Sequence, residues 1–299
     1  MKSIVITGAT GFIGAALVRE AIKEDIRVLC LVRKDSSNLN RIPESDLVKI
    51  EFCNIDEYCH HVSNKCYDVF YHLAWEKISN AFSDDIDIQF RNIQYAIDAV
   101  RLAKKMGCKK FIGAGSQAEY GIVTEPLRAE TPVNPENGYG IAKYAAGKLT
   151  RLLCSQLDLQ FNWARIVSIF GPYDRMNSVI MYTIHELQSG RSPELTKCEQ
   201  VWDYLYCDDT ARALLAIGKN GIDGKIYPLG SGTQKKLSEY LEIIRNIVNS
   251  DVILDFGKKD YYSHQPMYLC ADISDLLKDT GWKPEVSFED GIRKILKMV

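Results

Sequence analysis

A tyrosine and a lysine four residues apart are the pair in this chain best suited to proton transfer. Tyr139 and Lys143 stand at the start of a predicted helix, where this spacing puts both side chains on one face. A free tyrosine hydroxyl has a pKa of about 10, and a neighbouring ammonium group lowers that pKa by stabilising the phenolate. The pair is therefore a candidate general acid–base, although ordinary surface pairs on helices share its spacing.

A serine strengthens this interpretation. Ser116 directly follows a predicted strand, in the segment Gly-Ser-Gln-Ala-Glu-Tyr-Gly at 115–121. Ligands of open α/β sheets bind at the carboxyl ends of the strands. Ser116 could therefore donate a hydrogen bond to a substrate carbonyl beside Tyr139, whereas alone it would be interpreted as a turn residue.

The first predicted strand runs into a glycine-rich turn and then a helix. Gly8, Gly11 and Gly14 have the spacing G-x-x-G-x-x-G, with Phe12 and Ile13 before the last glycine. Such a turn brings backbone N–H groups and the positive end of a helix dipole to a pyrophosphate. A P-loop would need Lys-Ser or Lys-Thr after the last glycine, where this chain has alanines. We expect a dinucleotide-binding loop, with an unliganded turn as the alternative.

The end of the second predicted strand indicates which dinucleotide binds. The chain reads Leu-Val-Arg-Lys at 31–34, without the acid that usually accepts the ribose 2′-hydroxyl of NAD. The guanidinium of Arg33 can hold a 2′-phosphate in bidentate fashion. This predicts NADP(H), with a solvated basic pair as the alternative.

A parallel sheet would hold these candidates at one edge. Strands are predicted at 3–7, 26–32, 47–52, 69–72, 109–114 and 161–167, and helices at 11–23, 88–105 and 139–156. Apolar strands that alternate with helices indicate a parallel sheet covered on both faces. The predicted fold class is α/β, a doubly wound Rossmann sheet.

The pattern changes after Gly171-Pro172. Helices are predicted at 179–188, 208–218, 237–248 and 288–298, mixed with short strands. We expect an NADP-binding Rossmann domain at 1–171 with returning segments near 202–230, and a smaller, interleaved C-terminal substrate-binding cap at 172–201 and 231–299.

Composition excludes several classes of protein. The chain has 299 residues, 46% of them apolar, and 37 basic against 39 acidic residues give a net charge of −2. A disordered chain would be less apolar, and a nucleic-acid binder that neutralises phosphates is usually basic. There is also no run of 18 apolar residues, so we predict no membrane-spanning helix.

Nine cysteines raise the question of a metal or of disulfides. None lies in a C-x-x-C pair, and the spacing of Cys53, Cys59 and Cys66 around two histidines fits no common zinc pattern. We predict no metal, and reduced thiols in a cytoplasmic protein.

Together these segments resemble the extended short-chain dehydrogenase/reductases, and within them the NAD(P)-dependent nucleotide-sugar epimerase/dehydratase/reductase family. The resemblance covers nearly the whole chain. It rests on the glycine loop, His-Leu-Ala at 72–74, Ser116 before Tyr-Gly, the Tyr139/Lys143 pair, Arg165 with Phe-Gly-Pro at 170–172, Trp-Asp-Tyr-Leu-Tyr-Cys-Asp-Asp at 202–209, and Gly-Trp-Lys-Pro at 281–284.

The resemblance implies roles for the matching residues. Tyr139 would exchange a proton with a sugar hydroxyl or carbonyl, Lys143 would hold the nicotinamide ribose and lower the pKa of Tyr139, and Ser116 would orient the carbonyl. Candidate cofactor contacts are Gly8, Gly11, Phe12, Ile13 and Gly14 at the pyrophosphate, Arg33 at the 2′-phosphate, Asn54 and Ile55 at the adenine, and Leu73, Ala74 and Lys143. Candidate substrate contacts are Trp75, Gln117, Arg165 and Trp202.

Departures from the family pattern indicate which member this is. Sugar 4,6-dehydratases carry Asp-Glu directly after the catalytic Ser or Thr, where this chain has Gln117 and Ala118, so we do not expect dehydration. The chain resembles deoxysugar 4-ketoreductases of the CDP-abequose synthase or dTDP-4-dehydro-6-deoxyglucose reductase type. That resemblance implies NADPH-dependent reduction of the C4 keto group of a CDP- or dTDP-linked 4-keto-6-deoxyhexose, in deoxysugar and O-antigen polysaccharide biosynthesis.

Three alternatives stay open: an NAD-dependent nucleotide-sugar 4-epimerase, a non-catalytic NADP-binding regulator, and a reductase of a non-sugar ketone. Trp202 and His264 stand where the family usually has arginines, so Arg175, Lys258 and Lys259 are candidates for the substrate diphosphate. The resemblance also implies a homodimer, in which the Tyr139 helix and the helix at 92–105 form a four-helix bundle with a second copy.

Overall fold

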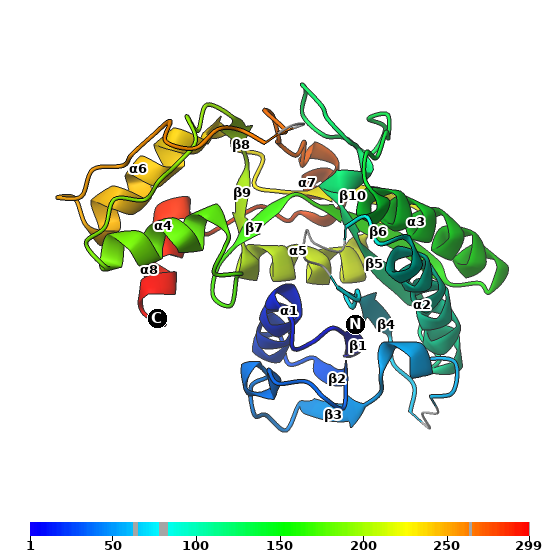
Figure 1. The fold of residues 1–299 in the computed structure, drawn as a ribbon. Coiled ribbons are helices and arrows are strands. Elements are labelled where there is room, and N and C mark those ends of the chain that lie inside the picture. Colours follow the sequence, from blue (N-terminus) through cyan, green and yellow to red (C-terminus); the bar gives the residue numbers. More distant parts are fainter. Residues whose placement is uncertain (62–64, 78–82, 263–264, 299) are drawn as a thin grey trace.

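A seven-stranded parallel sheet forms the centre of the protein (Figure 1). The computed structural model describes residues 1–61, 65–77, 83–262 and 265–298. The strand order β10-β6-β5-β4-β1-β2-β3 reverses direction at β1 and β4, which is the doubly wound arrangement. The strands are β1 (Ser3–Thr7), β2 (Arg27–Val32), β3 (Val48–Phe52), β4 (Val69–His72), β5 (Lys110–Ser116), β6 (Gln160–Ile166) and β10 (Ile226–Leu229).

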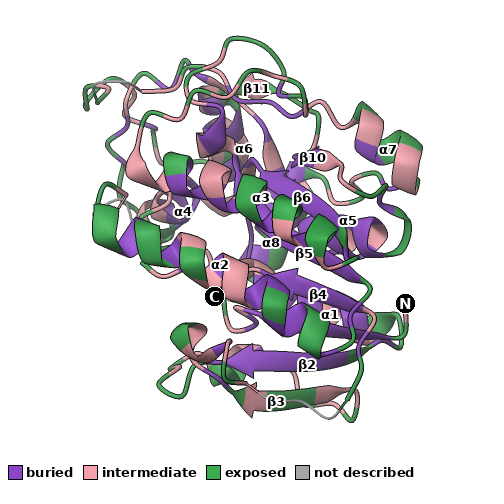
Figure 2. Cartoon of the chain, turned by 90° about the vertical axis from the view of Figure 1, so that its right-hand side faces the viewer, coloured by how far each residue is buried: buried purple, intermediate pink, exposed green. Residues whose placement is uncertain are grey.

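Helices cover both faces of this sheet, because each strand sends alternate side chains to opposite faces. From β1, Ile4 and Ile6 pack on the side of α1 (Phe12–Lys23) and α5 (Cys207–Asn220). Val5 packs on the opposite side, which α2 (Ile86–Lys105) and α3 (Gly138–Gln156) cover. In Figure 2, α2 lies in front of strands that are buried along their length. The predicted fold class is confirmed.

Several elements begin or end outside their predicted bounds. The side chain of Asp85 accepts the backbone N–H of Ile88 (3.0 Å), and that of Asn137 accepts the N–H of Gly140 (2.8 Å). These caps start α2 and α3 before the apolar repeats from which the helices were predicted. Strand β5 reaches Ser116, so the serine ends the strand rather than following it.

The second half of the chain builds a cap beside the sheet (left in Figure 1). In this cap, α4 (Val179–Gln188) and α8 (Phe288–Leu296) both pack on α6 (Leu237–Val248). Two short pairs of strands accompany them: β7 (Ser168–Phe170) with β9 (Tyr204–Tyr206), and β8 (Val201–Trp202) with β11 (Lys235–Lys236).

The cap is interleaved with the sheet. The chain runs from α4 back to α5 and β10, forms α6 in the cap, and returns again as α7 (Ser274–Thr280), which packs on α5 and β10. The last helix, α8, lies in the cap against α6. The domain boundaries at 171, 202–230 and 231 stay a prediction.

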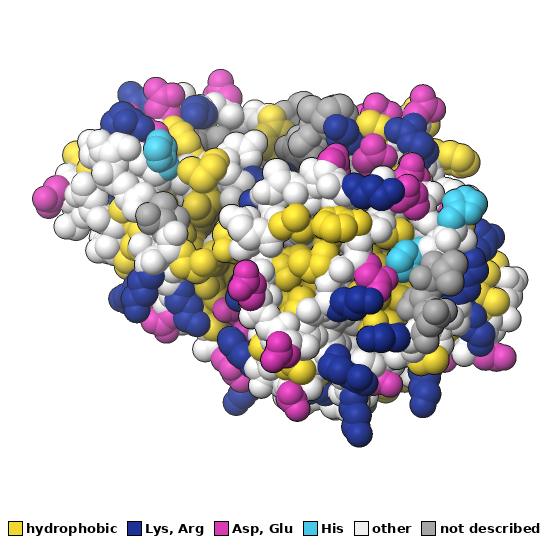
Figure 3. Space-filling model, turned by 90° about the horizontal axis from the view of Figure 1, so that it is seen from below, with side chains coloured by type: hydrophobic (Ala, Val, Ile, Leu, Met, Phe, Trp, Pro, Cys, Tyr) yellow, Lys and Arg dark blue, Asp and Glu magenta, His cyan; other side chains and the backbone are white. Residues whose placement is uncertain are grey.

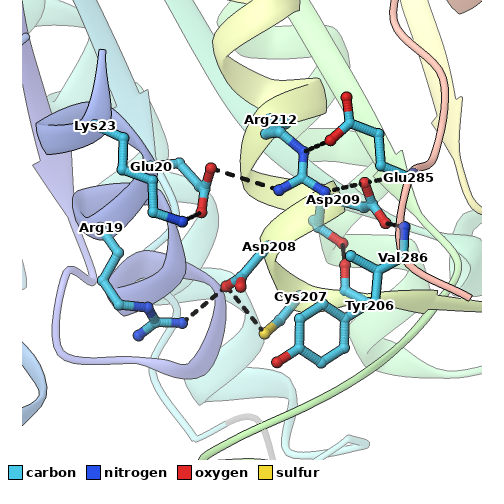
Figure 4. Close-up of polar contacts among 11 residues, drawn as sticks. Arg19, Glu20, Lys23, Tyr206, Cys207, Asp208, Asp209, Arg212, Glu285 and Val286 are labelled. Atoms are coloured by element: carbon cyan, nitrogen blue, oxygen red, sulfur yellow. Dashed lines mark hydrogen bonds and ion pairs between the residues drawn. The ribbon is translucent and has the colours of Figure 1, made fainter. Parts of the chain in front are cut away.

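A buried carboxylate joins these parts (Figure 4). Asp209 of α5 is fully buried, accepts the backbone N–H groups of Glu285 (2.9 Å) and Val286 (2.8 Å), and pairs with Arg212. Arg212 also lies 3.5 Å from Glu20 of α1. The second aspartate of the Asp-Asp pair at 208–209 therefore holds the C-terminal segment onto the helices of the sheet.

The described residues allow three observations on the surface charges, the helices and the metal-ligating side chains. Basic and acidic side chains are interspersed on the face shown in Figure 3. Every helix within the described residues is too short or too polar to span a membrane. In the same part of the chain, no three His, Cys, Asp or Glu side chains are grouped so that they could hold a metal ion.

Candidate active site

The glycine-rich turn lies against the loop that follows β4. The N–H of Gly11 donates to the carbonyl oxygen of Gly8 (3.0 Å) and closes the turn. Gly8 has a φ of +74°, and a Cβ atom on it would lie 2.8 Å from the backbone nitrogen of Ala74. The hydroxyl of Thr7 accepts the N–H of Ala74 (3.3 Å) and hydrogen bonds to Nδ1 of His72 (3.0 Å). The predicted contacts Gly8, Leu73 and Ala74 are thus neighbours.

Arg41 contacts this turn, and the predicted Arg33 lies at the end of β2. Arg33 follows β2, and its side chain is 65% exposed, 3.9 Å from Asp35. Arg41 was missed from the sequence, because nothing in the pattern brings residue 41 back to the turn. The guanidinium of Arg41 donates to the backbone carbonyl oxygen of Thr10 (3.5 Å). The side-chain hydroxyl of Thr10 accepts a hydrogen bond from the hydroxyl of Ser36 (3.2 Å). Ser36 and Arg41 therefore both contact Thr10 in the turn, and neither was among the predicted contacts.

Asn54 and Ile55 lie at the tip of the neighbouring strand β3. The side-chain oxygen of Asn54 accepts the backbone N–H of Lys34 (3.2 Å), and its own N–H donates to Glu57 (3.0 Å). Ile55 packs on the apolar cluster beneath α2 and α3. Asn54 thereby fixes the tip of β2, and the adenine contact stays a prediction.

The three predicted catalytic side chains converge at the ends of β4 and β5. Lys143 is buried, and its ammonium donates to the carbonyl oxygen of Ala114 in β5 (2.8 Å). The hydroxyl groups of Ser116 and Tyr139 share a hydrogen bond. The side-chain nitrogen of Lys143 lies 5.7 Å from the centroid of the Tyr139 ring. The structure thus brings together residues from one strand, β5, and one helix, α3, at the edge where the glycine turn lies.

Burial dominates the acid–base properties of this group. It raises the pKa of Tyr139 to about 12, against the hydrogen bond from Ser116 and the charge of Arg175, which lower it. It also lowers the pKa of Lys143 to about 7, against the charge of Glu119. The sequence predicted a lowered pKa for Tyr139, whereas this structure raises it, because withdrawal from water outweighs the groups that lower it. At neutral pH Tyr139 is a phenol, the form that can donate a proton.

A buried ion pair lies beneath Ser116. The carboxylate of Glu119 accepts the backbone N–H of Ser116 (2.9 Å), the indole N–H of Trp163 (2.8 Å) and Nε of Arg165 (2.7 Å). The Arg165 guanidinium also lies 4.5 Å from the centroid of the Tyr120 ring. Nothing in the sequence pattern indicates this role of Glu119, because only the pairing of β5 with β6 brings Arg165 to it.

The ion pair changes the assignment of Arg165. Its side chain is 3% exposed and that of Glu119 is 1% exposed, so the predicted substrate contact finds no open face. Gln117, the other predicted contact in this region, is half-buried directly after Ser116. Arg165 supports the turn that carries Ser116 and Gln117.

Trp202 lies in the cap, where its indole N–H donates to the hydroxyl of Ser168 (2.7 Å). It borders a cavity of about 460 Å³ that aromatic and polar side chains line, among them Asn177, Tyr182, Tyr204, Lys259 and Gln265. Of the candidate cations, Lys259 lines this cavity, and Lys258 lies 3.8 Å from Asp255. The charge of Arg175 is one of the influences that lower the pKa of Tyr139, although burial raises it overall. His264 lies outside the described residues.

Comparison with known proteins places the chain in a family. The model of the NAD dependent epimerase/dehydratase family matches residues 4–230, which is most of the chain. The chain belongs to the NAD-dependent epimerase/dehydratase family.

Relatives within this family align over the full length. The chain is 26% identical to a CDP-abequose synthase of Salmonella typhimurium, over 98% of this chain and 97% of that protein. It is 24% identical to a dTDP-4-dehydro-6-deoxyglucose reductase of Escherichia coli, over 100% and 98%. Its fold matches the structure of a UDP-glucuronic acid 4-epimerase from Bacillus cereus in complex with UDP-glucuronic acid and NAD, with a TM-score of 0.86, 20% identity, and coverage of 99% of this chain and 100% of that one.

The glycine turn fits the dinucleotide that the name of this epimerase/dehydratase family implies. A side chain at Gly14 would overlap the carbonyl oxygen of Gly8, so the turn is open only with glycine there. Helix α1 has no side-chain cap on its first N–H groups and no acidic residue in its first turn. These N–H groups and the positive end of the helix dipole suit a pyrophosphate.

The family's Asp-containing segment at 202–209 has a structural role at Asp203 as well. Its carboxylate is buried and accepts the backbone N–H groups of Ser231 (2.8 Å), Gly232 (3.1 Å) and Ala271 (3.1 Å). Asp203 therefore closes the loop after β10 onto the segment that follows residue 270.

Proposed function

We propose that this protein is an NADPH-dependent reductase of the C4 keto group of a nucleotide-linked 4-keto-6-deoxyhexose, such as a CDP- or dTDP-sugar. The observation that carries the proposal is the convergence of Ser116, Tyr139 and Lys143 beside the glycine turn, with no free carboxyl group next to Ser116. The two relatives named above, whose names describe deoxysugar chemistry, support the same class of substrate.

In this reaction the side chains act on the ketone oxygen. When NADPH is bound, its nicotinamide supplies the hydride that forms the new C–H bond. The hydroxyl of Ser116 donates a hydrogen bond to the oxygen on which negative charge develops. Tyr139, a phenol at neutral pH, gives that oxygen its proton, so that ketone, hydride and proton add up to the alcohol. Lys143, anchored on Ala114, faces the resulting phenolate with its ammonium group.

The residues after Ser116 argue against elimination of water. Gln117 and Ala118 carry no group that transfers protons. Glu119 is the nearest carboxylate, and it is buried and occupied by Ser116, Trp163 and Arg165. A dehydratase needs an acid and a base that face the sugar, and Glu119 faces the interior of the sheet.

The side chains around the tip of β2 support NADPH as the cofactor. We expect Arg33→Ala to weaken NADPH binding about tenfold to a hundredfold, because one charge-assisted bidentate contact is lost, while NADH binding changes less than about threefold. Titration of cofactor fluorescence measures both dissociation constants.

The neighbouring lysine is a matched control for that substitution. Lys34 carries the same charge at the same strand tip, but its ammonium is held by Glu57 at 3.1 Å. Lys34→Ala should therefore leave the ratio of the two dissociation constants unchanged. Equal losses of NADPH and NADH in Arg33→Ala would show that Arg33 does not read the 2′-phosphate.

The cavity beside Trp202 is the proposed site of the nucleotide. Its volume of about 460 Å³ falls in the range of small-molecule pockets, and Trp202, Tyr182 and Tyr204 give it aromatic walls. Asn177 lines the cavity two residues after Arg175, which acts on Tyr139. This short segment connects the cavity with the proton donor, and Lys259 is the cation proposed for the diphosphate.

We also propose that two copies pair through α2 and α3. Apolar side chains on these adjacent helices are between 44% and 78% exposed: Ile86, Phe90, Ile141, Leu149 and Leu152. Single exposed apolar residues are common on protein surfaces, but a group of this kind on adjacent helices is typical of a protein–protein interface. A helix pair of this kind can bury it against its own copy in a four-helix bundle.

Phe90→Glu should therefore convert a dimer into a monomer, because it places a charge in the apolar seam. Size-exclusion chromatography with light scattering measures the mass. Ile253→Glu is the control, since Ile253 is 77% exposed but lies outside these helices. A wild-type protein with the mass of one chain would contradict the bundle.

The function is tested by NADPH oxidation with CDP-, dTDP-, GDP- and UDP-linked 4-keto-6-deoxysugars, each product being identified as the alcohol. An NAD-dependent 4-epimerase is the second candidate, which the fold match to the Bacillus cereus epimerase favours. Copurified NAD that survives dialysis, with no net reduction, would favour the epimerase. NADPH binding without turnover of any sugar would favour a regulator, or a reductase of another ketone.

A further inference from the structure

The ring of Trp75 covers the ammonium group of Lys143. The side-chain nitrogen of Lys143 lies 3.7 Å from the centroid of the Trp75 ring. The same indole ring stands edge-on to Tyr139, with 6.0 Å between ring centroids and 83° between ring planes. Trp75 is thus in contact with both members of the Tyr139/Lys143 pair, although it belongs to the loop after β4 and they belong to α3.

Helix α2 holds Trp75 in this orientation. The indole N–H of Trp75 donates to the side-chain oxygen of Gln89 (3.1 Å). Asn92 lies one helical turn after Gln89. Its side-chain amide donates to the carbonyl oxygen of Glu76 (3.1 Å) and accepts the backbone N–H of Glu76 (2.7 Å). Gln89 and Asn92 are both buried. Helix α2 therefore holds the tryptophan in two ways, through the indole N–H of Trp75 and through the backbone of the following residue, Glu76.

The face of an indole ring is a suitable partner for a buried ammonium group. The aromatic quadrupole attracts a cation, most strongly for tryptophan and most strongly out of water. Lys143 is 4% exposed, and burial lowers its pKa to about 7. Two other titratable groups interact with it electrostatically. The charge of Glu119 raises the pKa of Lys143, and the pKa of His72 in β4 is lowered by burial and then by the ammonium of Lys143. The ring of Tyr139 on the same helix lies 5.7 Å from it, and the charge of Arg175 acts electrostatically on Tyr139.

We infer that Trp75 is a positioning residue that keeps Lys143 oriented and charged beside Tyr139. The inference rests on the proposed function, in which the Tyr139/Lys143 pair serves the ketone. It gives Trp75 a role beside the predicted contact with the sugar, because Lys143 occupies one face of the ring.

The test compares Trp75→Phe with Trp75→Leu, two apolar side chains of which only phenylalanine has a π face. The active form of Lys143 is the ammonium, so turnover is lost as the pH rises through its pKa. Removal of the ring destabilises the ammonium and lowers that pKa. In Trp75→Leu the alkaline limb of kcat should move down by about one pH unit, and in Trp75→Phe by less than half as much. Trp75→Met is a second variant without a ring, should Trp75→Leu fail to fold.

A cycle with Lys143→Met separates this role from a purely structural one. The dissociation constant of NADPH, followed by fluorescence from pH 6 to 9, needs no turnover. Trp75→Leu should weaken NADPH several-fold at pH 8 when Lys143 is present, and have little effect in the Lys143→Met background. Equal effects in both backgrounds, or identical alkaline limbs for Trp75→Phe and Trp75→Leu, would overturn the inference. Failure of the wild-type protein to reduce any sugar would instead refute the proposed function, while the binding cycle would still test Trp75.

Discussion

Tyr139→Phe should lower turnover of the 4-keto sugar by about 10² to 10⁴, the usual contribution of a positioned general acid. The substitution removes the one hydroxyl that shares a hydrogen bond with Ser116 and keeps the ring that packs against Trp75. Since the pKa of Tyr139 is raised to about 12, the lost proton donor is a phenol throughout the neutral range. Steady-state oxidation of NADPH measures the loss.

The binding of NADPH is the control for this variant. Phenylalanine leaves the glycine turn, Arg33 and Lys143 untouched, so the dissociation constant should stay within about twofold. A variant with near-normal turnover would remove Tyr139 from the role of proton donor. A variant that has lost NADPH binding would point to a folding defect instead.

Glu119→Gln should lower the free energy of unfolding by about 3 to 5 kcal/mol, because it leaves the charge of Arg165 buried without a counter-ion. Both side chains are at most 3% exposed and the two charged groups lie 2.7 Å apart, so solvent screens the pair little. Glutamine keeps the shape of the side chain and one acceptor oxygen, so the main difference from glutamate is the loss of the negative charge. Urea unfolding followed by circular dichroism should show a lower midpoint at an unchanged m-value.

The double variant Glu119→Gln/Arg165→Met is the matched control. It removes both charges and fills the space with an apolar chain of similar length, and a well-packed apolar replacement of a buried pair is often neutral. Most of the lost stability should return. Equal destabilisation by the single and double variants would mean that packing, rather than the unpaired charge, holds the turn below Ser116.

Local patterns predicted much of the site. The glycine spacing and the i, i+4 spacing of Tyr139 and Lys143 each act within one element, and strands that alternate with helices determine the class of sheet. These features need no knowledge of which strands are neighbours. Accordingly the sequence alone was enough to predict the sheet and the glycine turn, and to choose the residues that converge beside it.

What remained hidden depends on contacts between distant segments. Arg165 reaches Glu119 because β5 and β6 pair with Gly115 opposite Arg165, and no periodicity contains that register. Arg41 and Trp75 come from the connections between strands, whose course is determined by the elements on which they pack. The pKa of Tyr139 was misjudged for a related reason, since burial is a property of the assembled fold.

The interleaving of cap and sheet has a consequence for how the protein unfolds. The chain passes between the two parts several times, through α5 and β10, then α6, then α7 and α8. Neither the cap nor the sheet is one continuous stretch of chain. Cleavage of the chain at a single cap loop would therefore leave both fragments packed on the sheet. We therefore expect the cap and the sheet to unfold as one cooperative unit, because unfolding of either one removes contacts that hold the other together.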